Sequence, residues 1–366
     1  MAAFAPLSPA LTGLECVRCA ARYPVEDHPR GCPACHAAGQ SANLYCRYAE
    51  GTPLAQRLPY PGAWNFGVGP TPLTARPGLP EVLVKNEAIS HTGSHKDRFA
   101  AQVVAHAVAR GYRAVAVGSS GNAGYALAAH AAAAGLACVV AAFNYLPEST
   151  RAQLECLGAD LRLFEEDGDR LRCIADLADD PAVLTVSSIT DPVTGSHCIG
   201  IEGYKQIAWE LAEQHPADLH HVVVPSSRGD LAWGIHLGFQ DLQELTGRPA
   251  PRLHLVEPIP RLAAVLAGSA GLTDRFPGDI GRLHSIGGDT TTHQAHRAVV
   301  AGGGTALVVT DHQADLAFRR LTGRGQVWER SSATVFAAYE ALRADGTVRA
   351  GEQTALVATS HLFKGL

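Results

Sequence analysis

Short apolar runs alternate with amphipathic stretches along most of the chain. The apolar runs predict strands, and the stretches whose apolar positions lie three or four residues apart predict helices. The predicted strands cover residues 114–117, 137–142, 161–164, 183–187, 221–224, 253–256, 305–309 and 354–358. The predicted helices cover residues 99–108, 122–134, 148–157, 169–177, 203–213, 231–245, 315–320 and 332–342. This alternation is typical of an α/β protein whose largely parallel sheet carries helices on both faces.

The composition indicates a folded protein with small-molecule partners. Hydrophobic residues make up 46% of the 366 residues, and the net charge is −5. No basic stripe with interleaved aromatic residues appears, so we expect no nucleic-acid partner. No apolar run reaches the roughly 18 residues of a membrane span, and the first residues do not look like a leader. We therefore expect a cytoplasmic protein that does not bind membranes.

Four of the nine cysteines form two close pairs near the N-terminus. They are Cys16 and Cys19, followed after twelve residues by Cys32 and Cys35. Two CxxC pairs at this separation can hold one tetrahedral Zn²⁺ through four thiolates, which leaves no open position for water or substrate. We therefore predict a structural zinc site in a zinc-ribbon-like appendage. The alternatives are four incidental cysteines or a redox-active pair.

Lysine is rare in this chain, and one lysine stands in an unusual place. Only Lys85, Lys96, Lys205 and Lys364 are lysines among the 30 basic residues. Lys96 lies in the stretch HTGSHKDR, residues 91–98, between an apolar run and an amphipathic one. A Schiff base to a carbonyl needs an amine that can lose its proton, which a guanidinium cannot supply. A capped helix start with an exposed lysine is the alternative interpretation.

Three polar loops follow predicted strands. They are residues 118–123 (GSSGNA), 225–230 (PSSRGD) and 358–361 (ATSH). In parallel sheets, ligands bind beyond the carboxyl ends of the strands, where helix N-termini present free N–H groups to anions. Each loop alone could be an ordinary strand-to-helix turn. Together with Lys96 they predict one binding site.

With these pieces in view, the chain resembles threonine synthase and its relatives in the fold type II family of pyridoxal-phosphate enzymes. The resemblance runs in collinear order from about residue 69 to the C-terminus. The matching stretches are residues 69–73 (GPTPL, like GNTPL), 92–98 (TGSHKDR, like TGSFKDR), 118–123 (like SSGNxA), 201–205 (IEGYK, like IEGxK), 224–225, 329–333 (like EPASA) and 359–364 (TSHLFK, like TGHGLK).

The resemblance implies a fold and a domain organisation. The fold type II architecture has two open, twisted, largely parallel sheets with helices on both faces. We expect an appendage over residues 1–50, a large cofactor-binding domain over 51–95 and 191–366, and a small mobile domain over 96–190. The family also suggests a homodimer.

The resemblance also implies roles for individual residues. Lys96 is implied to form the Schiff base with pyridoxal 5′-phosphate and then to act as a base. Asn122 is implied to contact the phenolic oxygen, and Thr359 the ring nitrogen, where a neutral hydroxyl suits elimination and replacement chemistry. The residues implied to hold the phosphate are Ser226, Ser227, Arg228 and Gly229. Those implied to contact the amino-acid substrate are Ser94, His95, Ser119, Ser120 and Ala123.

Four departures from the family pattern concern the substrate. The phosphate loop is SSRG where the family usually has several glycines, and His95 stands where an aromatic residue usually precedes the lysine. Gly200 stands where threonine synthases commonly have a phosphate-binding arginine, and Leu362 replaces a glycine. These departures leave the cofactor prediction unchanged and argue against O-phosphohomoserine as the substrate.

The predicted function is β- or γ-elimination or replacement on a small amino acid that carries a leaving group. The alternatives within the family are true threonine synthase, cysteate synthase, diaminopropionate ammonia-lyase and a serine/threonine dehydratase. A catalytically silent binding or regulatory relative is the alternative outside enzymes, and the retained Lys96, Asn122 and Thr359 argue against it.

Overall fold

The computed structural model describes residues 6–63, 68–76, 79–119, 121–215, 217 and 219–364. These residues form two compact units. The first contains Met1–Val68 and Lys96–Gly203, and the second contains Gly69–His95 and Tyr204–Leu366. The chain therefore crosses between the units three times, after Val68, after His95 and after Gly203.

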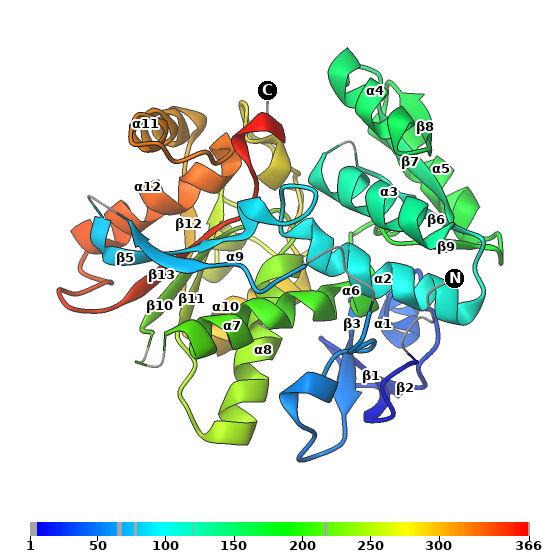
Figure 1. Cartoon of the computed structure of the whole chain (residues 1–366), viewed down its shortest axis with the longest axis horizontal. Helices are drawn as coiled ribbons and strands as arrows, with labels where there is room; N and C mark the ends of the chain where they lie inside the picture. Colours follow the sequence, from blue (N-terminus) through cyan, green and yellow to red (C-terminus); the bar gives the residue numbers. More distant parts are fainter. Residues whose placement is uncertain are drawn as a thin grey trace. The chain divides into compact units, whose positions relative to one another are not determined.

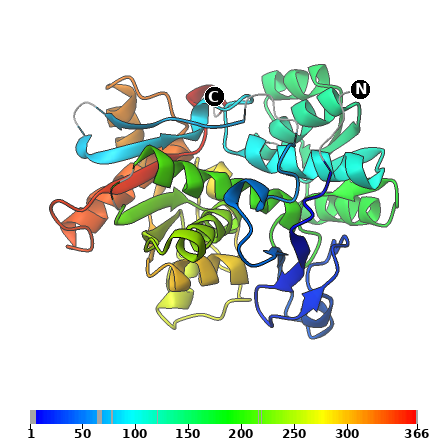
Figure 2. The ribbon, with the colours of Figure 1, turned by 60° about the horizontal axis from the view of Figure 1, so that its bottom comes forward.

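The N-terminal part of the first unit is a small antiparallel sheet with a short helix. Its strand order is β2 (Arg22–Tyr23), β1 (Leu11–Cys16), β3 (Leu44–Tyr48). Helix α1 (Pro33–Ala37) begins with a proline, which is well suited to the first helical position. The blue strands of this sheet lie next to the cyan helix α2 (Lys96–Arg110) in Figures 1 and 2.

The rest of the first unit is a parallel sheet with the order β8 (Ala159–Phe164), β7 (Ala137–Phe143), β6 (Ala114–Val117), β9 (Val183–Thr185). Helices α3 (Asn122–Ala134), α4 (Glu148–Cys156) and α5 (Asp167–Ala178) connect successive strands, as parallel pairing requires. The short helix α6 (Cys198–Ile201) follows β9 and packs on α2. Helix α3 ends at Gly135, whose φ of +73° is a left-handed C-cap.

The second unit contains a sheet with the order β12 (Ala306–Val308), β11 (Arg252–Glu257), β10 (His221–Pro225), β13 (Thr354–Ala358), β5 (Leu79–Asn86), β4 (Leu73–Arg76). Among these described strands only β4 runs antiparallel to its neighbour. The central strand β10 is buried along its whole length, as expected when helices cover both faces.

Helices cover this second sheet on both sides. Helix α12 (Arg330–Ala344), with α11 (Asp311–Thr322) packed against it, forms a core with Val84, Val223 and Leu356. Helices α7 (Lys205–Gln214), α8 (Asp230–Thr246) and α10 (His293–Ala301) lie on the side opposite α12 in Figure 1. Helix α11 begins with a capping box formed by Thr310 and Gln313.

The predicted fold class is confirmed, with corrections to the elements. The predicted strands and helices are all present, with bounds that differ by a few residues. The prediction contained no element between residues 257 and 304, where the structure has α9 (Leu262–Leu266), η4 (His284–Ile286) and α10. Short helices of this kind are too brief for a periodic pattern to identify.

The two units differ from the predicted domain ranges in three places. Residues 1–50, predicted as a separate appendage, lie in the same unit as residues 96–190. Residues 51–68 and 191–203 belong to the first unit. The reason is local packing on α2: the Tyr60 hydroxyl lies 2.9 Å from Nδ1 of His106, and Gly203 and Gly200 pack closely against Arg98 and Phe99. Within the described part of the chain, no helix is both long and apolar enough to cross a bilayer.

Candidate active site

Three chain segments meet at the carboxyl edge of the sheet in the second unit. They follow β5, β13 and β10, which are adjacent parallel strands in the order β10–β13–β5. Because parallel strands end at the same edge, the loops after them lie close together. These loops contain most of the predicted site residues of this unit.

The segment that precedes Lys96 pairs with the segment that follows β13. Ser94 and Ser360 form an antiparallel bridge, and the backbone N–H of His95 donates to the carbonyl oxygen of Thr359 at 2.9 Å. The N–H of His361 donates to the carbonyl oxygen of Gly93 at 2.9 Å. Gly93 has a φ of +79°, which favours glycine. The chain that leads to Lys96 is thus held against the end of β13.

The His95 side chain is also held at this position. Its Nδ1 lies 3.2 Å from the carbonyl oxygen of Thr359, and its ring lies 5.5 Å from the Tyr204 ring. A carbonyl oxygen can only accept, so this contact is a hydrogen bond when Nδ1 carries the proton. In the neutral ring, Nε2 is then the basic nitrogen. His95 is buried, so its ring has a defined orientation.

The Thr359 hydroxyl lies 2.7 Å from the hydroxyl of Ser332 in the first turns of α12. Ser332 Oγ also accepts the backbone N–H of Ser360 at 2.9 Å. Both hydroxyl-bearing residues are buried. This pair fixes the side chain that the family resemblance assigns to the ring nitrogen, and it supplies neutral oxygens without a carboxylate.

The loop after β10 has the shape of an anion cradle. Gly229 has a φ of +79°, and a Cβ there would lie 2.4 Å from the Cβ of Ala295, so only glycine fits. No described residue accepts the backbone N–H of Ser227 or of Gly229, which directly precedes α8. Such free N–H groups at a helix start bind phosphate oxygens. The loop therefore fits the phosphate of a cofactor.

Three of the four residues predicted to hold the phosphate also make hydrogen bonds within the protein. The N–H of Ser226 donates to Val256 O at 2.8 Å, and the Ser227 hydroxyl donates to Gly287 O at 2.6 Å. The carbonyl oxygen of Arg228 accepts from the Thr292 hydroxyl at 2.6 Å. These bonds hold the loop in place, and they leave the backbone N–H groups of Ser227 and Gly229 to donate to a phosphate.

Arg261 is a buried residue that organises this loop and was not predicted. Its guanidinium donates to four carbonyl oxygens at 2.9 to 3.0 Å, and its side chain is 0% exposed. The four acceptors belong to Ser226, Ile286, Gly287 and Gly288. Glu257 lies 3.4 Å from Nε and balances the charge. Burial lowers the pKa of Arg261, and Glu257 opposes that shift.

The remaining predicted residues belong to the first unit. Lys96 is the first residue of α2, and Asn122 is the first residue of α3 after β6. A Cβ on Gly124 would lie 2.4 Å from Ser119 O, so this loop also depends on close backbone approach. Ala123 follows Asn122 in α3, and Ser120 lies outside the described residues.

The structure therefore brings the predicted residues together in two groups. Ser94, His95 and Thr359 lie at the same sheet edge as the loop 226–229 in the second unit. Lys96, Ser119, Asn122 and Ala123 lie in the first unit, where strand or loop ends lead into α2 and α3. The covalent bond between His95 and Lys96 joins the two groups.

The four predicted zinc ligands form one cluster. Cys16 and Cys35 have sulfurs 3.7 Å apart, and so do Cys19 and Cys32. All four sulfurs lie within 4.8 Å of one another. Tetrahedral coordination with Zn–S bonds of about 2.3 Å places sulfurs about 3.8 Å apart. The N–H groups of Arg18 and Cys19 donate to Cys16 Sγ, so the cluster can hold a metal ion.

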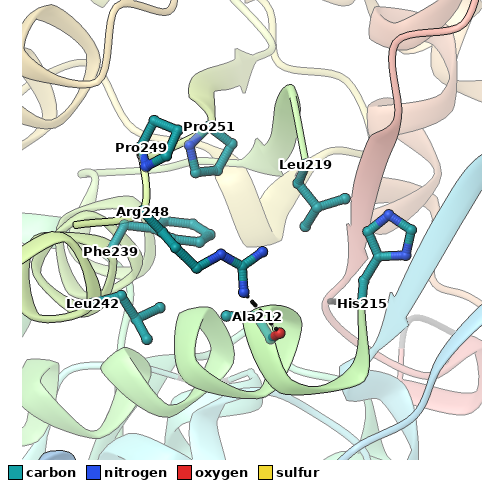
Figure 3. A pocket seen from close by; sticks show the side chains of 8 residues that line it. All are labelled: Ala212, His215, Leu219, Phe239, Leu242, Arg248, Pro249 and Pro251. Atoms are coloured by element: carbon teal, nitrogen blue, oxygen red, sulfur yellow. Dashed lines mark hydrogen bonds between the residues drawn. The ribbon is translucent and has the colours of Figure 1, made fainter. Parts of the chain in front are cut away.

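A surface pocket of the second unit lies away from these loops. Figure 3 shows it, with Leu219 just before β10, Pro251 just before β11, and Arg248 donating to Ala212 O at 3.3 Å. It is therefore at the amino edge of the sheet, opposite the loops that carry the predicted chemistry.

Sequence reasoning missed several residues that shape the site. Ser332 lies in the stretch that resembles EPASA, so its position in that motif was an available signal. Tyr204 directly follows the IEG stretch and was available in the same way. Arg261 and Thr292 lie in segments that match no motif, and no local pattern distinguishes them from surface residues.

The chain is similar to known proteins in sequence and in fold. A threonine synthase from Methanocaldococcus jannaschii is 27% identical over 308 residues, which are 78% of this chain and 71% of the relative. A threonine synthase from Methanosarcina acetivorans is 28% identical over 309 residues, covering 80% of this chain and 73% of the relative. The solved structure of the processed form of threonine deaminase isoform 2 from Solanum lycopersicum has a similar fold, with a TM-score of 0.67. It is 16% identical, and the match covers 80% of this chain and 83% of that one.

A family profile described as pyridoxal-phosphate dependent enzyme matches residues 65–360. The match spans the phosphate-type loop after β10, the loop after β6, and the loop after β13 up to Ser360. With the helix-start loops, the buried hydroxyls and the collinear motifs, it assigns the chain: this protein belongs to the family of pyridoxal-phosphate dependent enzymes.

Proposed function

We propose that this enzyme catalyses β- or γ-elimination or replacement on a small amino acid that carries a leaving group. When bound, pyridoxal phosphate supplies an electron sink that acidifies the α-carbon of an amino acid. Lys96 would hold the cofactor through its Nζ, and the same amine would serve as the base for the α-proton. The relatives named threonine synthase are the reason for choosing this reaction class.

The other residues of the proposed site bind and orient the cofactor and the amino-acid substrate. The backbone N–H groups of 227 and 229 hold the phosphate at the start of α8, with Arg228 adding charge. Asn122 would donate to the phenolic oxygen of the cofactor, and Thr359 would contact its ring nitrogen. Ser119, Ser120, Ala123 and Ser94 contact the substrate. His95 offers Nε2 as a second group that can accept a proton near the reacting carbon.

One observation carries the proposal: residues 93–95 pair with 359–361 through three backbone contacts. This pairing ties the chain directly before Lys96 to the buried Thr359–Ser332 hydroxyl pair. A binding protein that had lost catalysis would not need a lysine directly after a segment that is held against Thr359.

Gly200 supports a substrate other than O-phosphohomoserine. A Cβ at this position would lie 2.4 Å from Cε2 of Phe99, which is buried in α2. An arginine therefore cannot replace Gly200 without displacing Phe99. The Phe99 ring lies where a side chain at position 200 would begin. Threonine synthases commonly have a phosphate-binding arginine at this position.

True threonine synthase activity is the second candidate, because the curated relatives carry that name. The spectrum and turnover of the purified holoenzyme separate the candidates. We expect pyruvate, 2-oxobutanoate or a β-substituted product from serine, threonine, diaminopropionate or an O-acylated serine. Efficient threonine and phosphate release from O-phosphohomoserine would instead establish the second candidate. A protein that gains no visible band with pyridoxal phosphate would overturn the enzyme proposal.

The four-cysteine cluster is proposed to hold structural Zn²⁺, since its sulfur separations match tetrahedral coordination. We also propose a homodimer in the cytoplasm, on the strength of the family resemblance. Sedimentation of the holoenzyme tests the first of these two properties, and cell fractionation tests the second.

A further inference from the structure

A second cluster of metal-ligating side chains lies in the first unit. The Oδ1 of Asp27 lies 2.8 Å from Nε2 of His106 and 3.1 Å from Nε2 of His197. All three ligand atoms lie within 4.8 Å of one another. Asp27 comes from the loop between the two CxxC pairs, His106 from α2, and His197 from the residue before α6.

We propose that Asp27, His106 and His197 bind a divalent transition metal, with Zn²⁺ as the first choice, at a site separate from the four cysteines. Two imidazole nitrogens and one carboxylate oxygen are a donor set that Zn²⁺ accepts in proteins. Ligand atoms around tetrahedral Zn²⁺ lie about 3.4 Å apart. To admit the ion, the distances from Asp27 Oδ1 to His106 Nε2 and to His197 Nε2 need to lengthen by about 0.6 Å and about 0.3 Å.

Neighbouring groups orient two of the three ligands. Nδ1 of His106 lies 2.9 Å from the hydroxyl of the buried Tyr60, whose own N–H and C=O are bound by Gln102. The second oxygen of Asp27 accepts from the Tyr112 hydroxyl at 2.7 Å. Ligating histidines typically use their other nitrogen in such a contact, which fixes the ring. The cluster therefore has a supporting shell like that of a metal site.

A small cavity lies beside His197, the third proposed ligand. His197 has a side chain that is 7% exposed, and its Nδ1 has no hydrogen-bond partner among the described residues. His28 Nε2 is buried and also has no such partner. Both residues line a cavity of about 20 Å³, which is enough for one water molecule. A metal with three protein ligands takes water as its fourth, and this cavity lies beside one of the three, His197.

The site has a structural consequence. It ties the loop between the CxxC pairs to α2, ten residues beyond Lys96, and to the segment before Gly200. A metal here cross-links three segments that are distant in sequence. A hydrogen-bonded triad without metal would join the same segments more weakly.

The test is the metal content of the full-length holoenzyme after removal of loosely bound ions. We expect about two zinc ions per chain in the parent protein and about one in His197→Ala, since one site is lost. The matched control is His236→Ala, which removes another buried histidine and keeps about two ions. His197→Asn, which retains an N–H donor to Asp27, is the second variant and is expected to match His197→Ala.

Cobalt substitution distinguishes the two sites. The thiolate charge-transfer bands of the four-cysteine site are expected to persist in both His197 variants, while the weaker bands of a nitrogen and oxygen site disappear. Equal metal content in the parent and both variants, whether about one ion or about two, would overturn the proposal. Loss of the thiolate bands in the variants, with the weaker bands retained, would overturn it as well.

Discussion

The backbone N–H of His95 donates a 2.9 Å hydrogen bond to the carbonyl oxygen of Thr359, 264 residues later in the chain. The imidazole Nδ1 lies 3.2 Å from the same oxygen. One carbonyl thus fixes both the main chain and the side chain of the residue that precedes Lys96. This relation makes Lys96 the first residue to test.

Lys96→Ala and Lys96→Arg should both abolish the visible band that the bound cofactor gives in the parent enzyme. The arginine variant keeps the charge at the start of α2 but has no amine to attach the aldehyde. We expect turnover to fall by roughly 10³-fold or more, because both covalent attachment and a general base are lost. Circular dichroism checks that both variants fold. A Lys96→Arg enzyme with the parent band would contradict the assignment.

Arg261→Met should weaken cofactor binding through the loop 226–229. The substitution removes four hydrogen bonds to carbonyl oxygens and leaves Glu257 buried without its cation. Breaking a buried pair by removing one partner costs about 3–5 kcal/mol of folding stability. Chemical denaturation measures that loss, and titration with pyridoxal phosphate measures the affinity.

Two comparisons isolate the effect of Arg261. The double variant Arg261→Met/Glu257→Gln should recover part of the stability but not the affinity, because the carbonyl oxygens of Ser226 and of residues 286–288 still lack donors. Arg275→Ala removes an exposed pair with Asp289 and should cost under about 1 kcal/mol. Unchanged cofactor affinity in Arg261→Met would show that the loop does not depend on this residue.

Gly200→Ala should destabilise the protein by about 1–3 kcal/mol, because the new Cβ overlaps the Phe99 ring. The same change in a Phe99→Leu background should cost less, which a double-mutant cycle measures. Gly168→Ala in α5 is the matched control, since the nearest atom to its Cβ is the end of Arg172 at 3.5 Å. Additive effects of Gly200→Ala and Phe99→Leu would argue against the steric explanation.

His254 should make stability fall as the pH drops below about 6.5. Burial, with the charges of His221 and Arg252, lowers the pKa of His254 from 6.5 to about 4. Between these values the unfolded chain binds a proton that the folded chain does not, so the free energy of unfolding decreases as the pH falls. Over this whole pH range, His254 lowers the free energy of unfolding by at most roughly 3 kcal/mol.

Denaturation at several pH values, comparing the parent with His254→Phe, measures this contribution. The variant should show a shallower fall between pH 6.5 and 4. The control is His312→Phe, which changes an exposed histidine. Parallel stability curves for the parent and His254→Phe would contradict the prediction.

Cys32→Ser should remove about one zinc ion per chain and unfold the ribbon, because a structural Zn²⁺ supplies much of the folding free energy of so small a motif. Cys46→Ser is the matched control, since Cys46 is buried in β3 outside the cluster. Full zinc content in Cys32→Ser would exclude Cys32 as a ligand.

The local pattern of apolar and polar residues was sufficient to predict much of the secondary structure of this protein. Apolar runs alternating with amphipathic stretches indicate the strands and helices, because the period of side-chain burial is a property of a few neighbouring residues. The CxxC pairs and the glycine-containing loops are local signals in the same sense. The order of loops along the chain was enough to identify the fold family and the cofactor class.

Tertiary structure decided which distant residues act together. Three contacts join segments from 35 to 264 residues apart: His95 with Thr359, Arg261 with Ser226, and Asp27 with His106 and His197. The periodicity of apolar positions in a short stretch of sequence does not predict contacts between such distant residues. The need for glycine at position 200 became visible only with the structure, because the Phe99 ring leaves no space for a Cβ there. The sequence by itself determined the helices, the strands and the loops between them. Tertiary packing decided which residues hold the site in place, because the burial of a side chain depends on the whole fold.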